Sequence, residues 1–210
     1  VEARLPGIRD VILRSVGAPP GTGMLKAHFT FMARYHRHGH ATILRASAAS
    51  GEDLLRREPS LFFGSVHGTL GHLLLAERLW MSRICGEDPA ERGVDASLWD
   101  REGTDASWQL AALPSELPGA LLSLADEWVS LVDRRDEAWL SSRFSYSTTE
   151  GLAREGTVGK ALAQVFNHAT HHRGQISCVL FSNGMRSSGE GYPVLDLQGM
   201  GDPFYAGYDE

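Results

Sequence analysis

The segment spanning residues 157–184 constrains the fold more than any other part of this sequence. Its apolar positions recur three and four residues apart, the pattern of a helix that buries one face in a helical bundle. Thr157 stands at the N-cap position, and Asn183-Gly184 is a normal stop at the C-terminal end. The core-facing seam consists of Val158, Leu162, Val165, Ala169, His172, Ile176 and Val179. A histidine therefore occupies a seam position where an aliphatic residue is expected.

The histidines of this segment have the spacing of metal ligands. His168 and His172 are four residues apart, so a helix places both rings on one face, where their nitrogens can converge on one ion. Neutral imidazole is a usual ligand of zinc and its neighbours in the first transition series. The alternative is a pair of hydrogen-bonded core histidines, since a buried ring requires a partner. His171 lies about 100° further round the helix and points elsewhere.

Three further long helices are expected before this one, over residues 24–49, 61–84 and 118–140. Residues 86–114 form a long connection with one short helical turn, anchored by isolated apolar side chains at Leu98, Trp99 and Trp108. The alternation around Gly151 predicts a short hairpin before the last helix. The prediction is an all-α, antiparallel four-helix bundle, with an N-terminal extension over residues 1–23 and one domain over residues 24–210 that includes an irregular tail.

Composition excludes several functional classes. The 210 residues carry a net charge of -6 without a dense basic block, which argues against a nucleic-acid surface and against an anionic membrane surface. Cys85 and Cys178 belong to no CxxC pair and are expected to be reduced thiols. The sequence has neither the apolar core of a signal peptide nor a run long enough to span a bilayer. We expect a cytoplasmic protein.

Two stretches carry a resemblance to a known family. The first is FFGSVHGTLGHLLLAERLW over residues 62–80, and the second is VFNHATHHRGQI over residues 165–176; the segment PVLDL over residues 193–197 adds to them. Together they make the chain similar to the DinB/YfiT-like family of metal-binding four-helix-bundle proteins. The resemblance covers the chain from about Met24 onwards.

The resemblance implies a three-histidine metal site. It adds His72 to His168 and His172, with zinc or nickel as the usual metal and water in the remaining positions. Three protein nitrogens plus water is the open arrangement of a catalytic site. Characterised relatives include transferases and isomerases that depend on a low-molecular-weight thiol, and members commonly form homodimers. His67 and His171 are out of helical phase with the neighbouring ligand and are predicted not to bind the metal.

Two functions follow from the resemblance. The first is a metal-dependent enzyme, a thiol-dependent transferase, isomerase or hydrolase, acting on a small electrophilic molecule through metal-bound water or thiolate. The second is a metal-binding bundle without turnover, with a stress-response or scaffold role. The sequence contains neither an HExxH motif nor a Gly-rich nucleotide loop, so it supports neither a zinc protease nor nucleotide chemistry.

The first helix departs from the family pattern. Where relatives often read Tyr-Asn-x-Trp-x-Asn, this chain reads YHRHGH over residues 35–40. His36 and His40 share a helical face near the expected mouth of the site, where they could add a ligand or relay protons to it. The alternative is a pair of histidines hydrogen-bonded between helices. Glu77 could accept a hydrogen bond from a ligand histidine, or could be a surface carboxylate paired with an arginine.

Overall fold

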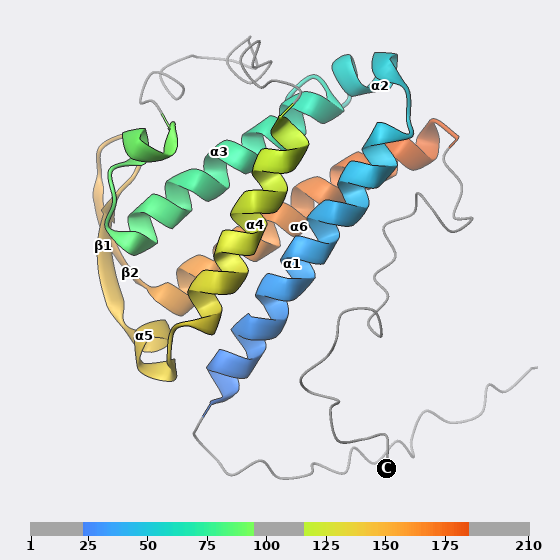
Figure 1. The fold of residues 1–210 in the computed structure, drawn as a ribbon. Helices are drawn as coiled ribbons and strands as arrows, with labels where there is room; N and C mark the ends of the chain where they lie inside the picture. Colours follow the sequence, from blue (N-terminus) through green and yellow to red (C-terminus); the bar gives the residue numbers. More distant parts are fainter. Residues whose placement is uncertain (1–22, 95–115, 185–210) are drawn as a thin grey trace, which may run out of the picture.

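Helices make up most of this protein, as the computed structural model in Figure 1 shows. The structure describes residues 23–94 and 116–184. In chain order its elements are α1 (Met24–Ala48), α2 (Glu52–Arg56), α3 (Val66–Cys85), η1 (Pro89–Arg92), α4 (Leu117–Asp133), α5 (Glu137–Ser141), β1 (Arg143–Ser147), β2 (Ala153–Thr157) and α6 (Val158–Ser182). The expected extension up to residue 22, the anchors Leu98, Trp99 and Trp108, and the tail from residue 185 with its PVLDL segment lie outside the described residues. The prediction of an all-α fold with one small hairpin is confirmed.

The four long helices pack around a shared interior. α1 lies against α4 and α6, and α3 lies against the same two helices. The chain direction in Figure 1 shows that α1 and α6 run one way, while α3 and α4 run the other. Each long helix therefore has one antiparallel and one parallel neighbour. A parallel pair such as α3 and α4 requires a long return of the chain, because short loops join antiparallel neighbours.

The apolar seams predicted from sequence form the core. Every seam residue of α6 is buried, from Val158 to Val179, and Trp128 of α4 is completely buried beside them. Burial of such side chains contributes about 1.5–3 kcal/mol each relative to exposure, so the seam supplies much of the driving force for packing. Within residues 23–94 and 116–184, no helix is both long and apolar enough to cross a membrane.

α3 begins five residues later than expected, at Val66 instead of residue 61. Gly64 adopts a positive φ of 69°, a conformation that interrupts a helix. Ser65 then caps α3, because its hydroxyl oxygen accepts a hydrogen bond from the backbone N–H of Gly68 at 2.8 Å. Phe63 consequently belongs to the loop before α3, which allows its ring to fold over that helix.

The third predicted helix is divided into α4 and α5. α4 ends at Asp133, and the carboxylate of Asp136 accepts a hydrogen bond from the N–H of Trp139 at 2.8 Å, which starts α5 separately. Glu137 in the first turn of α5 then accepts from the N–H groups of Leu25 and Lys26, at 3.1 and 2.9 Å. A carboxylate at a helix N-terminus satisfies donors that have no partner within the helix. The break in the helix thus attaches α5 to the start of α1.

The predicted hairpin leads directly into α6. β1 and β2 pair antiparallel, with Arg143 opposite Thr157, and Gly151 has a positive φ of 77° in the turn between them. Thr157 is the N-cap residue of α6, as predicted, although its side chain accepts no hydrogen bond there. The last residue of the hairpin is therefore also the residue at which α6 begins.

Candidate metal centre

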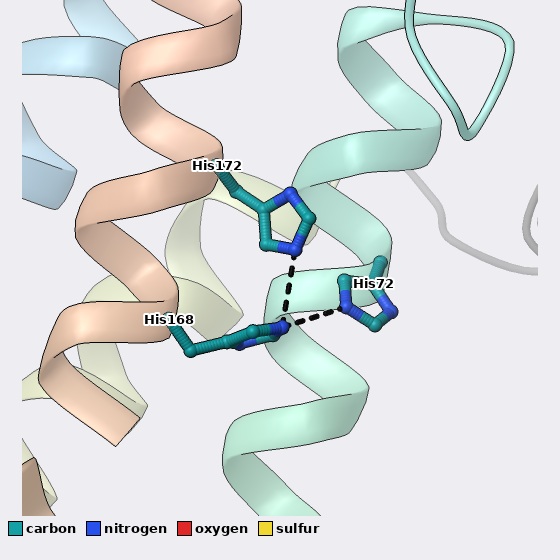
Figure 2. Close-up of side chains that lie close together, drawn as sticks. All are labelled: His72, His168 and His172. Carbon is teal, nitrogen blue, oxygen red and sulfur yellow. Dashed lines mark hydrogen bonds between the residues drawn. The ribbon is translucent and has the colours of Figure 1, made fainter. Parts of the chain in front are cut away.

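Three histidines from two helices converge on one point. α3 supplies His72, and α6 supplies His168 and His172 on the same helical face, as the four-residue spacing predicts. Figure 2 shows the three rings turned toward one another between α3 and α6. The Nε2 atom of His168 lies 3.2 Å from Nε2 of His72 and 3.1 Å from Nε2 of His172. His172 is buried, whereas the other two rings are partly exposed, so the group lies near the surface.

Hydrogen bonding alone does not account for this arrangement. An imidazole nitrogen carries either one N–H or one lone pair, directed along a single line in the plane of the ring. The Nε2 atom of His168 therefore cannot form a well-aligned hydrogen bond with both of its neighbours. A cation at the centre can receive the lone pairs of all three nitrogens at once. The residues present thus fit a divalent metal ion that prefers nitrogen ligands.

Gln175 sets the tautomer of His172. Its side-chain oxygen lies 2.8 Å from Nδ1 of His172, and because an amide oxygen only accepts, Nδ1 carries the proton. Nε2 of His172 is then left with its lone pair pointing into the group. Hydrogen bonds of this kind orient metal-binding histidines and raise their basicity. Gln175 was not among the residues predicted from sequence, although its position three residues after His172, on the same side of the helix, was a usable signal.

The rings are neutral at physiological pH. Burial is the largest cause that lowers the pKa of His72 to about 3. Repulsion from His172 and His168, when these rings are protonated, lowers it further. Burial likewise lowers the pKa of His172 to about 4, and it lowers the pKa of His168. Protons therefore compete weakly for these nitrogens, and the lone pairs remain available to an ion.

Phe63 forms one wall beside the histidines. Its ring stacks on that of His72, with centroids 4.1 Å apart and planes 18° apart. The loop approaches α3 so closely that a Cβ atom on Gly68 would lie 2.3 Å from the carbonyl oxygen of Phe63. Glycine at position 68 therefore allows the loop to seat Phe63 against His72.

The remaining sequence candidates near the histidines lie outside this convergent group. His171 is exposed, with its ring centroid 4.9 Å from that of His172, and His67 is partly exposed on the first turn of α3. That neither binds the metal remains a prediction. Both cysteines are free thiols, and burial raises the pKa of Cys85, which makes it a poorer nucleophile at neutral pH.

His36, His40 and Glu77 form a second group, deep in the core. Nε2 of His36 lies 3.0 Å from one carboxylate oxygen of Glu77, and Nε2 of His40 lies 2.8 Å from the other. All three side chains are at most 1% exposed, so the two histidines do not lie at the mouth of a site, and Glu77 is not a surface carboxylate. The first helix turns both rings inward, where Glu77 pairs with Nε2 of each, although Nδ1 of His40 has no hydrogen-bond partner. The alternative of histidines hydrogen-bonded between helices is what the structure shows.

The charge state of this second group follows from its contacts. Burial alone would raise the pKa of Glu77, but attraction to His36 and His40 and their hydrogen bonds lower it below its ordinary value. Burial is also the largest cause that lowers the pKa of His36, to about 4. A Glu77 carboxylate that accepts the N–H of a neutral His36 ring is consistent with both directions.

Acid is expected to destabilise the metal-free protein between pH 6.5 and about pH 4. Burial lowers the pKa of His36 from its ordinary 6.5 to about 4 in the folded chain, so on acidification the unfolded chain takes up the proton first. The contribution of this histidine is complete above pH 6.5 and falls by about 1.4 kcal/mol per pH unit down to the folded pKa. Urea unfolding at pH 7.5, 6 and 5 measures the slope, and His36→Asn should flatten it. Identical slopes in the two proteins would contradict the assignment.

Comparison with known proteins identifies a family that matches most of the chain. The model of the family described as DinB matches residues 24–195, well over half of the chain. The match includes both histidine groups and all four long helices. No curated protein matches the chain.

Proposed function

The chain belongs to the DinB family, and we propose that it uses His72, His168 and His172 to hold one divalent metal ion. The observation that carries the proposal is the convergence of three Nε2 atoms, with contacts of 3.1 and 3.2 Å, because the single Nε2 of His168 cannot form an aligned hydrogen bond with both neighbours. In keeping with the family, we infer that the four long helices form its four-helix bundle. Zinc and nickel are the proposed metals, because both accept imidazole nitrogen.

We further propose that the protein is an enzyme acting on a small electrophilic molecule. Three protein ligands leave coordination positions open, whereas structural zinc is normally closed by four. The partial exposure of the His72 and His168 rings supports access of a small molecule to the site. When bound, a divalent ion lowers the pKa of a coordinated water or thiol and stabilises negative charge on a substrate.

The surrounding residues have defined parts in this proposal. Gln175 holds His172 with its lone pair directed inward, and Phe63 covers one face of His72, which keeps water from that side. A low-molecular-weight thiol is the proposed cosubstrate, by analogy with the family. A homodimer in the cytoplasm is the proposed state of the protein, on the same analogy and on the acidic composition with free thiols.

Two measurements test this function. Elemental analysis of the purified protein should find about one zinc or nickel ion per chain, and its absence after reloading would refute the metal site. A screen of electrophilic substrates, with and without low-molecular-weight thiols, should then show turnover that disappears with a chelator and returns with the metal. A metal-loaded protein that turns over no class of substrate would instead support the non-catalytic role, in stress response or as a scaffold.

Gln175→Ala is expected to weaken metal binding by about 10- to 100-fold, the usual effect of losing a hydrogen bond that orients a metal ligand. Without the amide oxygen, the proton of His172 can move to Nε2, which removes the lone pair from the group. Competition with a chromophoric chelator measures the change. Gln164→Ala, at an exposed position of α6, is the matched control and should keep the wild-type affinity. Equal affinities for the two variants would show that Gln175 does not orient the ligand.

A further inference from the structure

The carboxylate of Glu77 stands where all four long helices meet. It comes from α3 and accepts hydrogen bonds from His36 and His40 of α1, at 3.0 and 2.8 Å. The indole N–H of Trp128 on α4 donates to it as well, at 3.3 Å. One buried group thus joins three helices through charge-assisted hydrogen bonds, which are stronger than those between neutral groups.

Arg173 extends this network to α6. Its Nη1 atom lies 3.4 Å from Nδ1 of His36, and its Nη2 atom donates to the hydroxyl of Thr170 at 2.9 Å. Because a guanidinium only donates, Nδ1 of His36 accepts, and Nε2 of His36 carries the proton that it gives to Glu77. The Arg173 side chain crosses α1 at Gly39, where a Cβ atom would lie 2.8 Å from Nε. We call His36, His40, Glu77, Trp128 and Arg173 the Glu77 cluster.

The Glu77 cluster is not built as a second metal site, although His36, His40 and Glu77 could offer one ligand atom each. Each carboxylate oxygen already holds its own ring at hydrogen-bond length, unlike the single shared nitrogen of His168. The cluster also contains one carboxylate and the positive charge of Arg173, which is only 7% exposed. A divalent ion there would add two positive charges to a buried group that is already balanced, at a large desolvation cost.

The same two helices carry both groups. On α3, Glu77 follows His72 by five residues, a rise of about 7.5 Å along the axis. On α6, Arg173 directly follows His172. A slide or rotation of α6 against α1 and α3 would break the contact of Arg173 with His36, and it would also separate His72 from the other two rings. Metal sites need their ligands held within about 0.5 Å of the productive geometry.

We propose that the Glu77 cluster positions the metal site, by fixing the height and rotation of α6 relative to α3. Glu77 and Arg173 are positioning residues in this sense, since they act through His72, His168 and His172. This inference rests on the proposed metal function of those histidines. The Glu77 cluster thus holds the ligand histidines of α3 and α6 in one geometry before the metal ion binds.

Cobalt(II) titration of the full chain tests the inference, because the visible spectrum of the bound ion reports its coordination geometry. The variants are Glu77→Gln, which puts an amide N–H against one of the ring donors, and Arg173→Lys, which keeps the charge but loses the planar fork. Both should bind Co²⁺ about 10- to 100-fold more weakly and shift its absorption bands. Arg56→Lys and Glu155→Gln, at exposed positions, are the matched controls and should leave affinity and spectrum unchanged. Leu140→Val, which loosens the core at α5, separates positioning from lost stability and should lower the Tm without shifting the bands.

The outcomes separate the inference from the function on which it rests. Wild-type affinity and spectrum in both Glu77→Gln and Arg173→Lys would overturn positioning while the metal site stands. Two Co²⁺ ions per wild-type chain, one of them lost in Glu77→Gln, would overturn it by making the cluster a metal site itself. If Glu77→Gln does not fold, Arg173→Lys decides alone. A wild-type chain that binds no Co²⁺ would refute the proposed function and this inference with it.

Discussion

His168→Ala is expected to weaken metal binding more than any other single change. The Nε2 atom of His168 is the one in contact with both other nitrogens, at 3.1 and 3.2 Å. Its loss leaves two ligands on opposite helices and removes a third of the protein's donor set. We expect an affinity at least about 100-fold lower, since even residues behind a ligand typically contribute 10- to 100-fold. Chelator competition and elemental analysis measure the change.

His72→Ala and His172→Ala should follow His168→Ala closely, whereas His171→Ala and His67→Ala should keep the ion. The second pair matches the first in residue type and helix, so it controls for the general effect of removing an imidazole. Circular dichroism of each variant establishes that the helices persist. Full occupancy in all three ligand variants would show that the convergence of these rings has another cause.

Glu77→Ala is expected to cause the largest loss of stability, about 3–5 kcal/mol. That is the usual consequence of removing one partner of a buried ionic network. Without the carboxylate, the N–H groups of His36, His40 and Trp128 lose their acceptor, and Arg173 loses the negative charge that balances it. Single domains are stable by about 5–15 kcal/mol in total, so the loss is a large fraction of the free energy of unfolding. Urea unfolding of the metal-free protein measures the difference.

The size of the effect distinguishes a buried network from an ordinary surface charge. Glu77→Gln keeps an acceptor oxygen and should lose less stability than Glu77→Ala. Glu155→Ala removes an exposed carboxylate that pairs with Arg143, and it should change stability by no more than about 0.5 kcal/mol. A Glu77→Ala protein as stable as Glu155→Ala would mean that the Glu77 cluster contributes little to folding.

The Glu77 cluster and the three-histidine site differ in hydrogen bonding and in exposure to solvent. In the Glu77 cluster, both carboxylate oxygens accept hydrogen bonds, and Nδ1 of His40 is the one ring nitrogen of the cluster without a partner. The histidine site is open, because its nitrogens face one another and two of its rings reach the surface. The hydrogen bonds of the Glu77 cluster can hold helices in place. The three histidine nitrogens, whose lone pairs point toward one another, can instead bind a metal ion.

The predicted helix ends are wrong where a capping side chain sets the boundary, because helical periodicity does not reveal such caps. Apolar residues stand on both sides of each boundary, at positions 61–63 before Val66 and at Trp139 and Leu140 after Asp133, so their spacing could not show that α3 starts at Val66 or that α4 stops at Asp133. The decisive contacts are the caps made by Ser65 and Asp136. Such caps contribute about 1 kcal/mol, enough to place a helix end but too little to show in a pattern of apolar residues.

The sequence by itself determined the helices, their buried faces and the pairing of His168 with His172, because each depends on the 3.6-residue turn and on near neighbours in the chain. Periodicity placed His72 beside an apolar face, and its place with the other two histidines came from the resemblance to relatives. Only the tertiary structure decided that His36 and His40 turn inward to Glu77, and that Arg173 and Trp128 join them from α6 and α4. These contacts span 37 to 137 residues of chain, and they exist because four packed helices exclude water from a carboxylate that must then find its partners inside the protein.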